Sequence, residues 1–343
     1  GTEGEASEVM VVYILGNAPV KADFRIQGRP VPAVGRGGAV RCDFSSLRVE
    51  QYGSMTDSTT SGAQGGYRVL AIHAHPDDES SKGAATMARY IDEGHRVRVL
   101  TCTGGEEGSI LNPRMDRPEV HENLVDVRRE EMARAAEILG VEHRWLGYVD
   151  SGLPESGKRE DLPDGCFALQ DVDEVAAEVV AQIREFQPHV IITYDENGGY
   201  PHPDHLMVHA VSMRAWELAG DPEYRPDLGE AWAPLKLYYT HGFVVTRFNM
   251  LAEAVAQRQA NGEMTLREYQ HTMTQLAFWR AKQDVYPRVT TRVNAADWFD
   301  RRDAALTAHA TQIDPDGPFF GVDVDVQRET WPTEEFELAK TRV

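Results

Sequence analysis

Cysteine is scarce in this chain, which holds only Cys42, Cys102 and Cys166 among its 343 residues. Three scattered cysteines build neither a disulfide framework nor a CxxC zinc site, and they fit a reducing compartment. Long apolar runs are absent too, because no stretch reaches the ~18 residues that a membrane-spanning helix needs. The pattern of a signal peptide is also missing, since Glu3 and Glu5 stand where positive charge would be expected. We therefore expect a cytoplasmic protein without a membrane partner.

Positive charge is in short supply as well. The chain has 35 Lys and Arg against 55 Asp and Glu, a formal net charge of −20. A field of that sign repels polyanions, so the composition argues against nucleic acid or an anionic membrane surface as a partner. Most of the excess acid serves solubility, and a local basic pocket for a small anionic substrate stays possible. The oligomeric state has no signal in the sequence.

Residues 1–66 differ in composition from the rest of the chain. Residues 11–15 are apolar enough for a short strand, but residues 54–66 are rich in Gly, Ser and Thr and are typical of a flexible linker. Met55 lies inside that linker. We interpret Met55 as a natural start preceded by appended or upstream-translated sequence. A small native strand added to the fold is the alternative.

From residue 67 onward, apolar runs alternate with amphipathic segments. The predicted strands span residues 69–72, 97–101, 143–146, 190–193 and 237–240. The predicted helices span about residues 81–93, 126–139, 171–186, 204–219, 251–261 and 266–283. Strands that alternate with helices favour a parallel sheet covered on both faces. The expected fold is α/β: a Rossmann-like, doubly wound, mostly parallel sheet with helices on both faces and a mixed C-terminal extension.

The first predicted strand runs directly into the segment HAHPDDE at residues 73–79. Ligands bind beyond the carboxyl ends of strands in open parallel sheets, so this position is a candidate for a functional site. His75, Asp77, Asp78 and Glu79 would repel and desolvate one another unless a cation compensates them. Imidazole with carboxylate is a ligand set for zinc or a late transition metal. By itself the segment is equally well explained as an acidic helix N-terminus with a solvated histidine.

A second polar segment, DENGGYPHPDH at residues 195–205, follows the strand predicted at residues 190–193. If both strands are parallel, the two segments emerge at the same edge of the sheet. Glycines let the backbone approach a ligand closely. Two such segments at equivalent strand ends make one shared metal site the better interpretation.

The motifs HPDDE at residues 75–79 and HPDH at residues 202–205 together resemble the LmbE/PIG-L family of zinc-dependent N-acetylglucosamine deacetylases and amidases. The resemblance extends from about residue 67 to about residue 219 and more weakly beyond. It implies that His75, Asp78 and His205 bind Zn²⁺ and that Asp77 is the general base. Three protein ligands would leave zinc an open position, as in catalytic sites. The same ligand set would also accept iron(II).

The resemblance assigns further roles in the second motif. It implies that His202, as an imidazolium, stabilises the oxyanion, that Asp204 orients His202, and that Tyr200 contacts the transition state. Such a site would hydrolyse an amide, with a proton accepted from water and later delivered to the leaving amine. A catalytically silent metal- or sugar-binding module is the alternative from another class.

Several other segments are similar to one branch of the family, the mycothiol S-conjugate amidases of actinobacteria. These segments lie at residues 80–87, 101–108, 110–113, 149–153, 165–168 and 194–200. The branch implies a small-molecule partner, a thiol–pseudodisaccharide conjugate whose amide is hydrolysed to a mercapturic acid and glucosaminyl-inositol in thiol-based detoxification. The deacetylase of mycothiol biosynthesis and a related amidase of an antibiotic pathway are the alternatives.

The same branch implies substrate-binding roles for Lys82, Arg128 and Asp150. Each of the two cations also has a plain structural explanation: Lys82 could pair with Glu79, and Arg128 could belong to a solvated helix face with i,i+3 pairing. His309 is equally well explained as a residue that reaches the cleft or as a satisfied core or surface histidine. We assign residues 67–343 to one hydrolase domain, with residues 67–219 as the metal-binding core and residues 240–343 shaping or covering the substrate pocket.

Overall fold

A parallel sheet of five strands lies at the centre of the computed structural model, which describes residues 66–154, 156 and 158–343. The strands are β1 (Arg68–His73), β2 (Arg96–Thr103), β3 (Glu142–Tyr148), β4 (Val190–Thr193) and β5 (Lys236–His241). β1 pairs in parallel with both β2 and β4, β3 pairs with β2, and β5 pairs with β4. All five predicted strands are therefore present, and the predicted fold class is confirmed.

Two further strands extend the sheet beyond β5 in the opposite direction. β7 (Thr333–Thr341) is antiparallel to β5, and β6 (Thr291–Asn294) is antiparallel to β7. The complete strand order is β3-β2-β1-β4-β5-β7-β6. This edge is the mixed C-terminal extension that was expected, although its strands were not located from the sequence.

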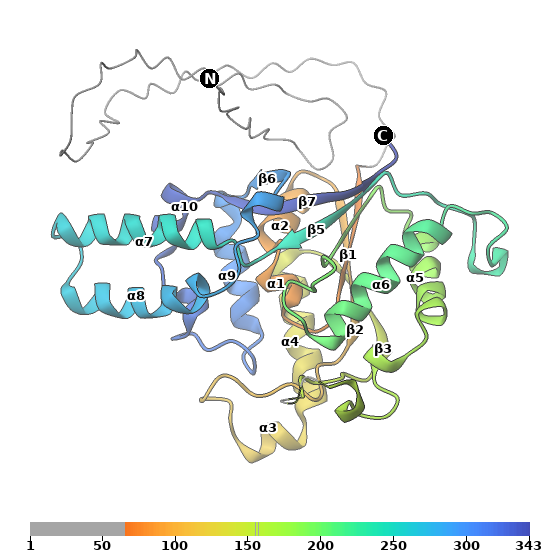
Figure 1. The fold of residues 1–343 in the computed structure, drawn as a ribbon, viewed down its shortest axis with the longest axis horizontal. Coiled ribbons are helices and arrows are strands. Elements are labelled where there is room, and N and C mark those ends of the chain that lie inside the picture. Colours follow the sequence, from red (N-terminus) through yellow and green to blue (C-terminus); the bar gives the residue numbers. More distant parts are fainter. Residues whose placement is uncertain (1–65, 155, 157) are drawn as a thin grey trace, which may run out of the picture.

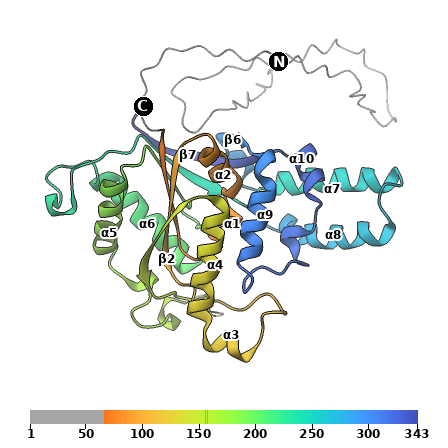
Figure 2. The same ribbon diagram turned by 180° about the vertical axis from the view of Figure 1, so that it is seen from behind.

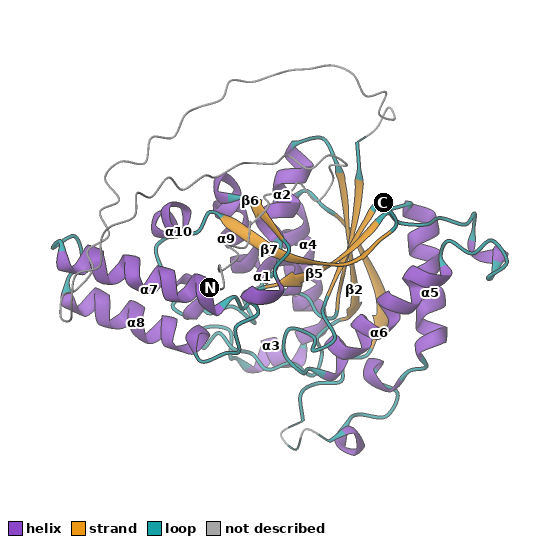
Figure 3. Ribbon diagram, turned by 45° about the horizontal axis from the view of Figure 1, so that its top comes forward, coloured by secondary structure: helices purple, strands orange, loops and turns teal. Residues whose placement is uncertain are grey.

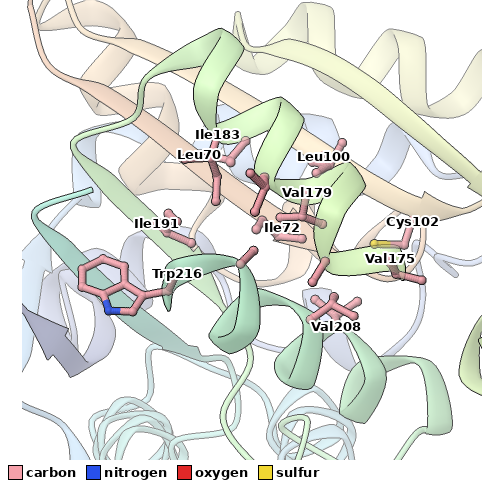
Figure 4. Close-up of a cluster of buried hydrophobic side chains, with 14 of the residues drawn as sticks. Leu70, Ile72, Leu100, Cys102, Val175, Val179, Ile183, Ile191, Val208 and Trp216 are labelled. Atoms are coloured by element: carbon pink, nitrogen blue, oxygen red, sulfur yellow. The ribbon is translucent and has the colours of Figure 1, made fainter. Parts of the chain in front are cut away.

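Alternate residues of each strand point to opposite faces of the sheet, and both faces are covered by helices. Leu70 and Ile72 of β1 pack under α5 (Val172–Phe186) and α6 (Pro203–Leu218), in the apolar cluster shown in Figure 4. Val69 and Ala71 face α2 (Ala84–Asp92), α4 (Leu124–Leu139) and α9 (Phe299–Ala308) instead. These helices are seen in front of the sheet in Figure 2.

The C-terminal third adds a separate apolar cluster beside the sheet. α7 (Val245–Ala260) and α8 (Leu266–Arg280) lie side by side and pack with α10 (Val324–Thr330), as Figures 1 and 3 show. A capping box at Thr265 and Glu268 begins α8. This cluster carries five aromatic rings, on Phe243, Phe248, Tyr269, Trp279 and Phe319. No helix in the described part of the chain is long and apolar enough to cross a membrane.

One predicted helix is divided in two. The segment expected at residues 81–93 forms α1 (Asp78–Ser81) and α2, because Gly83 interrupts it with φ +84. Two short helices, α3 (Pro118–Glu122) and α10, and the longer α9 were not predicted. The strand expected at residues 11–15 lies outside the described residues, as does the linker at residues 54–66 apart from Gly66.

Candidate metal centre and active site

The two histidine-containing loops meet at the switch point of the sheet. β1 and β4 are neighbours, yet the chain runs from β1 outward to β2 and β3 before it returns to β4. Loops after such a strand pair diverge and leave a crevice at the carboxyl ends of the strands. His75 follows β1, and His202 and His205 follow β4, so the topology brings them to one place.

The backbone turns sharply between β1 and α1. Asp77 has φ 98, in the left-handed region that side chains other than glycine seldom adopt. Its backbone N–H donates to Glu79 Oε2 at 3.0 Å, and the carbonyl of Pro76 accepts from Gln312 Nε2 at 2.8 Å. These contacts hold a strained residue in place, and strain of this kind is common in active sites.

Three atoms on His75, Asp78 and His205 are spaced as metal ligands should be. His75 Nδ1 lies 3.3 Å from His205 Nε2, and Asp78 Oδ2 lies 3.4 Å from each of those nitrogens. A tetrahedral site with metal–ligand distances of ~2.0–2.1 Å has its ligand atoms about 3.3–3.4 Å apart. The three side chains are buried. The predicted ligands therefore form one face of a tetrahedron whose size suits zinc or a metal of similar radius.

The other ring nitrogens of both histidines are already engaged. His75 Nε2 lies 3.2 Å from Asp204 Oδ2 and 3.3 Å from Asp150 Oδ1, and His205 Nδ1 lies 2.8 Å from the carbonyl of Gly198. Metal-binding histidines commonly donate their second N–H to a carboxylate or a carbonyl. A Cβ at Gly198, where φ is +68, would come within 2.7 Å of His205 Cβ, so this close approach requires glycine.

Two other groupings of side chains lie close enough to be considered for a metal. His202 joins His75 and His205, and Asp150 and Asp204 join His75, each group within 4.8 Å. The second grouping would use His75 Nε2, which the two carboxylates already hold. The spacing of 3.3–3.4 Å among all pairs of its atoms favours the set of His75, Asp78 and His205.

Asp78 is held as a carboxylate by neighbouring donors. Its Oδ1 accepts from Lys82 Nζ at 2.6 Å, and its Oδ2 accepts from Tyr194 Oη at 2.6 Å. Burial by itself raises the pKa of Asp78, but the charge of Lys82, followed by His205, holds it well below its usual value. Lys82 thus pairs with Asp78 and not with Glu79. Its predicted role in substrate binding remains a prediction.

Asp77 differs from Asp78 in its surroundings. Among the described residues, its carboxylate accepts no hydrogen bond, whereas Asp78 accepts several. Burial, and then the neighbouring charge of Asp78, raise the pKa of Asp77 to about 7. A base is most effective when its pKa lies near the working pH. The structure therefore separates two adjacent aspartates that the residue pattern alone could not distinguish.

His202 begins α6 as its N-cap, and this geometry changes the expected protonation. His202 Nδ1 accepts the backbone N–H of Asp204 at 3.2 Å. Burial, and then the charges of His75 and His205, lower the pKa of His202 to about 3. The positive end of the helix dipole also opposes a second proton. The imidazolium that was expected is therefore disfavoured, and a neutral ring that carries its proton on Nε2 fits the contacts.

Asp204 and Tyr200 both lie near His202. The Asp204 carboxylate accepts from the backbone N–H of Ser151 at 2.9 Å and contacts His75, so only its backbone N–H reaches His202. The ring of Tyr200 is 4.7 Å from that of His205 and 6.0 Å from that of His202, and 37% of Tyr200 is exposed. Tyr200 therefore lies at the mouth of the site, where a substrate would enter.

Arg128 and Asp150 organise the loops that follow β2 and β3. Arg128 is fully buried in place of the solvated helix face that was considered, and its guanidinium donates to the carbonyls of Gly105, Gly108 and Ser109. Asp150 accepts from the backbone N–H of Glu107 at 3.2 Å. Both residues shape the side of the site formed by the loops after β2 and β3, which carries Glu106, Glu107 and Asp150 and is called the polar wall below. Direct contact of Arg128 or Asp150 with a substrate stays a prediction.

Two partners of this site were not assigned from the sequence, which left the place of His309 open and did not single out Tyr194. His309, at the end of α9, has its Nε2 2.7 Å from Glu79 Oε1, and both side chains are fully buried. Tyr194 directly follows β4, a position that could have drawn attention because strand ends line the site. No local pattern marks His309, because its partner is 230 residues away.

Comparison with known proteins identifies the family. Residues 70–216 match the family profile PIG-L, GlcNAc-PI de-N-acetylase. The mycothiol S-conjugate amidase of Streptomyces coelicolor is 53% identical over 279 residues, which cover 80% of this chain and 92% of that protein. The chain belongs to the PIG-L family.

Two further proteins resemble this chain, one in sequence and one in fold. The 1D-myo-inositol 2-acetamido-2-deoxy-alpha-D-glucopyranoside deacetylase of Geodermatophilus obscurus is 41% identical over 280 residues, covering 80% of this chain and 92% of the relative. The N,N'-diacetylchitobiose deacetylase of Pyrococcus horikoshii has a similar fold, with a TM-score of 0.52, 17% identity and coverage of 79% and 83% of the two chains. The two relatives in sequence, an amidase and a deacetylase, are hydrolases that act on amide bonds, so the chain belongs to a family of amidases and deacetylases.

Proposed function

We propose that this chain is a metal-dependent amidase that hydrolyses the amide of mycothiol S-conjugates. The products would be a mercapturic acid and glucosaminyl-inositol, as in thiol-based detoxification. The observation that carries the proposal is the ligand triangle of His75, Asp78 and His205, with sides of 3.3–3.4 Å, in a chain 53% identical to a mycothiol S-conjugate amidase. The deacetylase relatives, at 37–41% identity, support acetate removal less strongly.

His75 Nδ1, Asp78 Oδ2 and His205 Nε2 would hold the cation. When bound, a divalent zinc or iron(II) ion would supply Lewis acidity for the amide carbonyl and for water. The carboxylates of Asp150 and Asp204 keep His75 oriented through Nε2. Lys82 and Tyr194 keep Asp78 ionised and fixed. The ligands are thus positioned before a substrate arrives.

Asp77 is the proposed general base. Its carboxylate would accept the proton of the attacking water and then deliver it to the nitrogen of the leaving amine as the C–N bond breaks. His202 would donate its Nε2 proton in a hydrogen bond to the oxyanion that forms on the carbonyl oxygen. As a neutral donor, His202 resembles other catalytic histidines placed at helix N-termini. Tyr200, at the mouth, would contact the same oxygen.

The polar wall formed by the loops after β2 and β3 is the proposed binding site of the sugar and inositol. Glu106, Glu107 and Asp150 meet there, and Arg128 holds the loop that carries the two glutamates. Hydroxyl groups of a pseudodisaccharide need acceptors of this kind. Lys82 remains a candidate for recognition of the acyl group.

The proposal is tested by comparing kcat/KM for two substrates after loading with zinc or iron(II). One is a mycothiol S-conjugate, and the other is the N-acetylated glucosaminyl-inositol. A preference of about tenfold or more for the conjugate is expected. A large preference for acetate removal would reassign the chain to the biosynthetic deacetylases, and no hydrolysis of either substrate would remove both functions.

A further inference from the structure

A narrow cavity with an aromatic wall lies beside the metal centre, between α7, α8 and the segment before α10. Its wall includes the apolar side chains of Phe243, Phe248, Leu251, Leu276, Trp279, Leu306, Phe319 and Val322. Trp279 stacks on Phe243 and on Phe248, each at 5.4 Å between ring centroids. The volume is about 80 Å³, which suits a slender or flat group.

The polar residues on this wall are committed to partners within the protein. Arg247 donates to the carbonyl of Gly242 at 2.6 Å, and Arg302 donates to Gln327 Oε1 at 3.0 Å. Glu334 accepts the backbone N–H of Thr86 at 2.7 Å. An occupant would therefore meet the aromatic and aliphatic side chains together with polar groups that already have partners within the protein.

Three wall residues also touch the candidate active site. Ser81 Oγ accepts from Lys82 Nζ at 2.9 Å, and Lys82 is the partner of Asp78. Gly242 abuts the same lysine, since a Cβ there would lie 3.0 Å from Lys82 Cγ. The ring of Phe243 is 6.4 Å from that of Tyr200. The cavity is thus adjacent to the metal centre, with Lys82 and Tyr200 between them.

The strand order places this cavity on one side of the metal centre and the polar wall on the other. The metal ligands follow β1 and β4, in the middle of the sheet. The polar wall follows β2 and β3, whereas Phe243 follows β5, on the opposite flank. In Figures 1 and 3, α1 lies between the α7–α8 pair and α6. An amide bound at the centre would have one half directed toward the carboxylates of the polar wall and the other toward the stacked aromatic rings of the cavity.

We infer that the aromatic cavity binds the apolar substituent on the sulfur of the acyl half of the substrate, while the polar wall binds the sugar half. The inference rests on the proposed function, because only an S-conjugate carries such a substituent. An apolar group entering the cavity leaves water for a surface of stacked rings, which favours aryl and alkyl substituents. The pocket residues from Gly242 onward lie beyond the family match, which ends at residue 216. On this inference, the choice of the S-substituent depends on the C-terminal third.

The test measures kcat/KM of the metal-loaded full chain with S-benzyl and S-methyl mycothiol. The native protein should prefer the benzyl conjugate about tenfold, the size of effect expected when one apolar group fills a pocket. Phe243→Ala removes part of the wall, and Val322→Phe fills the space. Each should reduce the ratio of the two kcat/KM values to about one, for opposite steric reasons.

Phe278→Ala is the matched control. Phe278 lies on the same helix next to Trp279, is 50% exposed and does not line the cavity, so its replacement should keep the native ratio. Melting temperatures verify that each variant is folded. A native enzyme without benzyl preference, or an unchanged ratio in both Phe243→Ala and Val322→Phe, would overturn the inference while the proposed function stands. A native enzyme that hydrolyses neither conjugate would overturn the proposed function, and the inference with it.

Discussion

Replacement of His309 by leucine should destabilise the protein strongly through the charge that it leaves behind. His309 and Glu79 form an ion pair at 2.7 Å with both side chains fully buried. Burial by itself raises the pKa of Glu79, but the charge and hydrogen bond of His309 bring it down to about 2. The glutamate is therefore ionised at neutral pH, and His309→Leu would leave a buried carboxylate without its cationic partner.

The size of the effect follows from the remaining contacts of Glu79. Removal of one partner from a buried ion pair costs about 3–5 kcal/mol. Glu79 keeps two hydrogen bonds, from the Ser80 hydroxyl and from the backbone N–H of Asp77, so we expect the lower end, about 3 kcal/mol. A loss of that size lowers the melting temperature of a domain this large by about 6–12 °C.

Urea unfolding of four proteins measures the coupling: the native chain, His309→Leu, Glu79→Gln and the double variant. Glu79→Gln should destabilise the native chain but leave the His309→Leu background unchanged or improve it, because the amide carries no charge. An equal cost of Glu79→Gln in both backgrounds would refute this account. His241→Leu is the matched control, since Glu337, 3.0 Å from His241, is more exposed and also pairs with Arg288. His241→Leu should lower the free energy of unfolding clearly less than His309→Leu does.

Three further outcomes test the site. Asp77→Asn should lower kcat by about 10²-fold or more, the usual contribution of a general base, while metal content by elemental analysis stays at the native level; loss of the metal would instead make Asp77 a ligand. His202→Gln should lower kcat by about 10²-fold with a small change in KM, since it removes a donor to the oxyanion; an effect confined to KM would argue for substrate binding. A chelator should abolish activity and lower the melting temperature, both restored by zinc or iron(II), because a ligand that binds only the folded state stabilises it. Full activity in metal-free protein would contradict the metal assignment.

The sequence determined the sheet and the place of the site on it. Apolar runs such as residues 190–193 and the helical spacing between them predict parallel strands, and parallel strands present their carboxyl ends together. The HPDDE and HPDH motifs follow two of these ends, so a shared site was expected before any contact was known. β7 was not predicted, because charged residues such as Glu334 and Glu335 are unusual in a buried strand. Their charges are met by α2 and by Arg247, which lie far away in the chain.

The tertiary structure alone decided which atoms face one another. Local spacing predicts that His75 is a ligand, but the choice of Nδ1 depends on Asp150 and Asp204, which hold Nε2 from other loops. The neutral form of His202 depends on its place at the start of a helix. The aromatic cavity forms only because α7 and α8 pack beside the metal loops. A sequence pattern records the period of a helix or strand, whereas protonation and specificity arise from partners that only packing brings within a few ångströms.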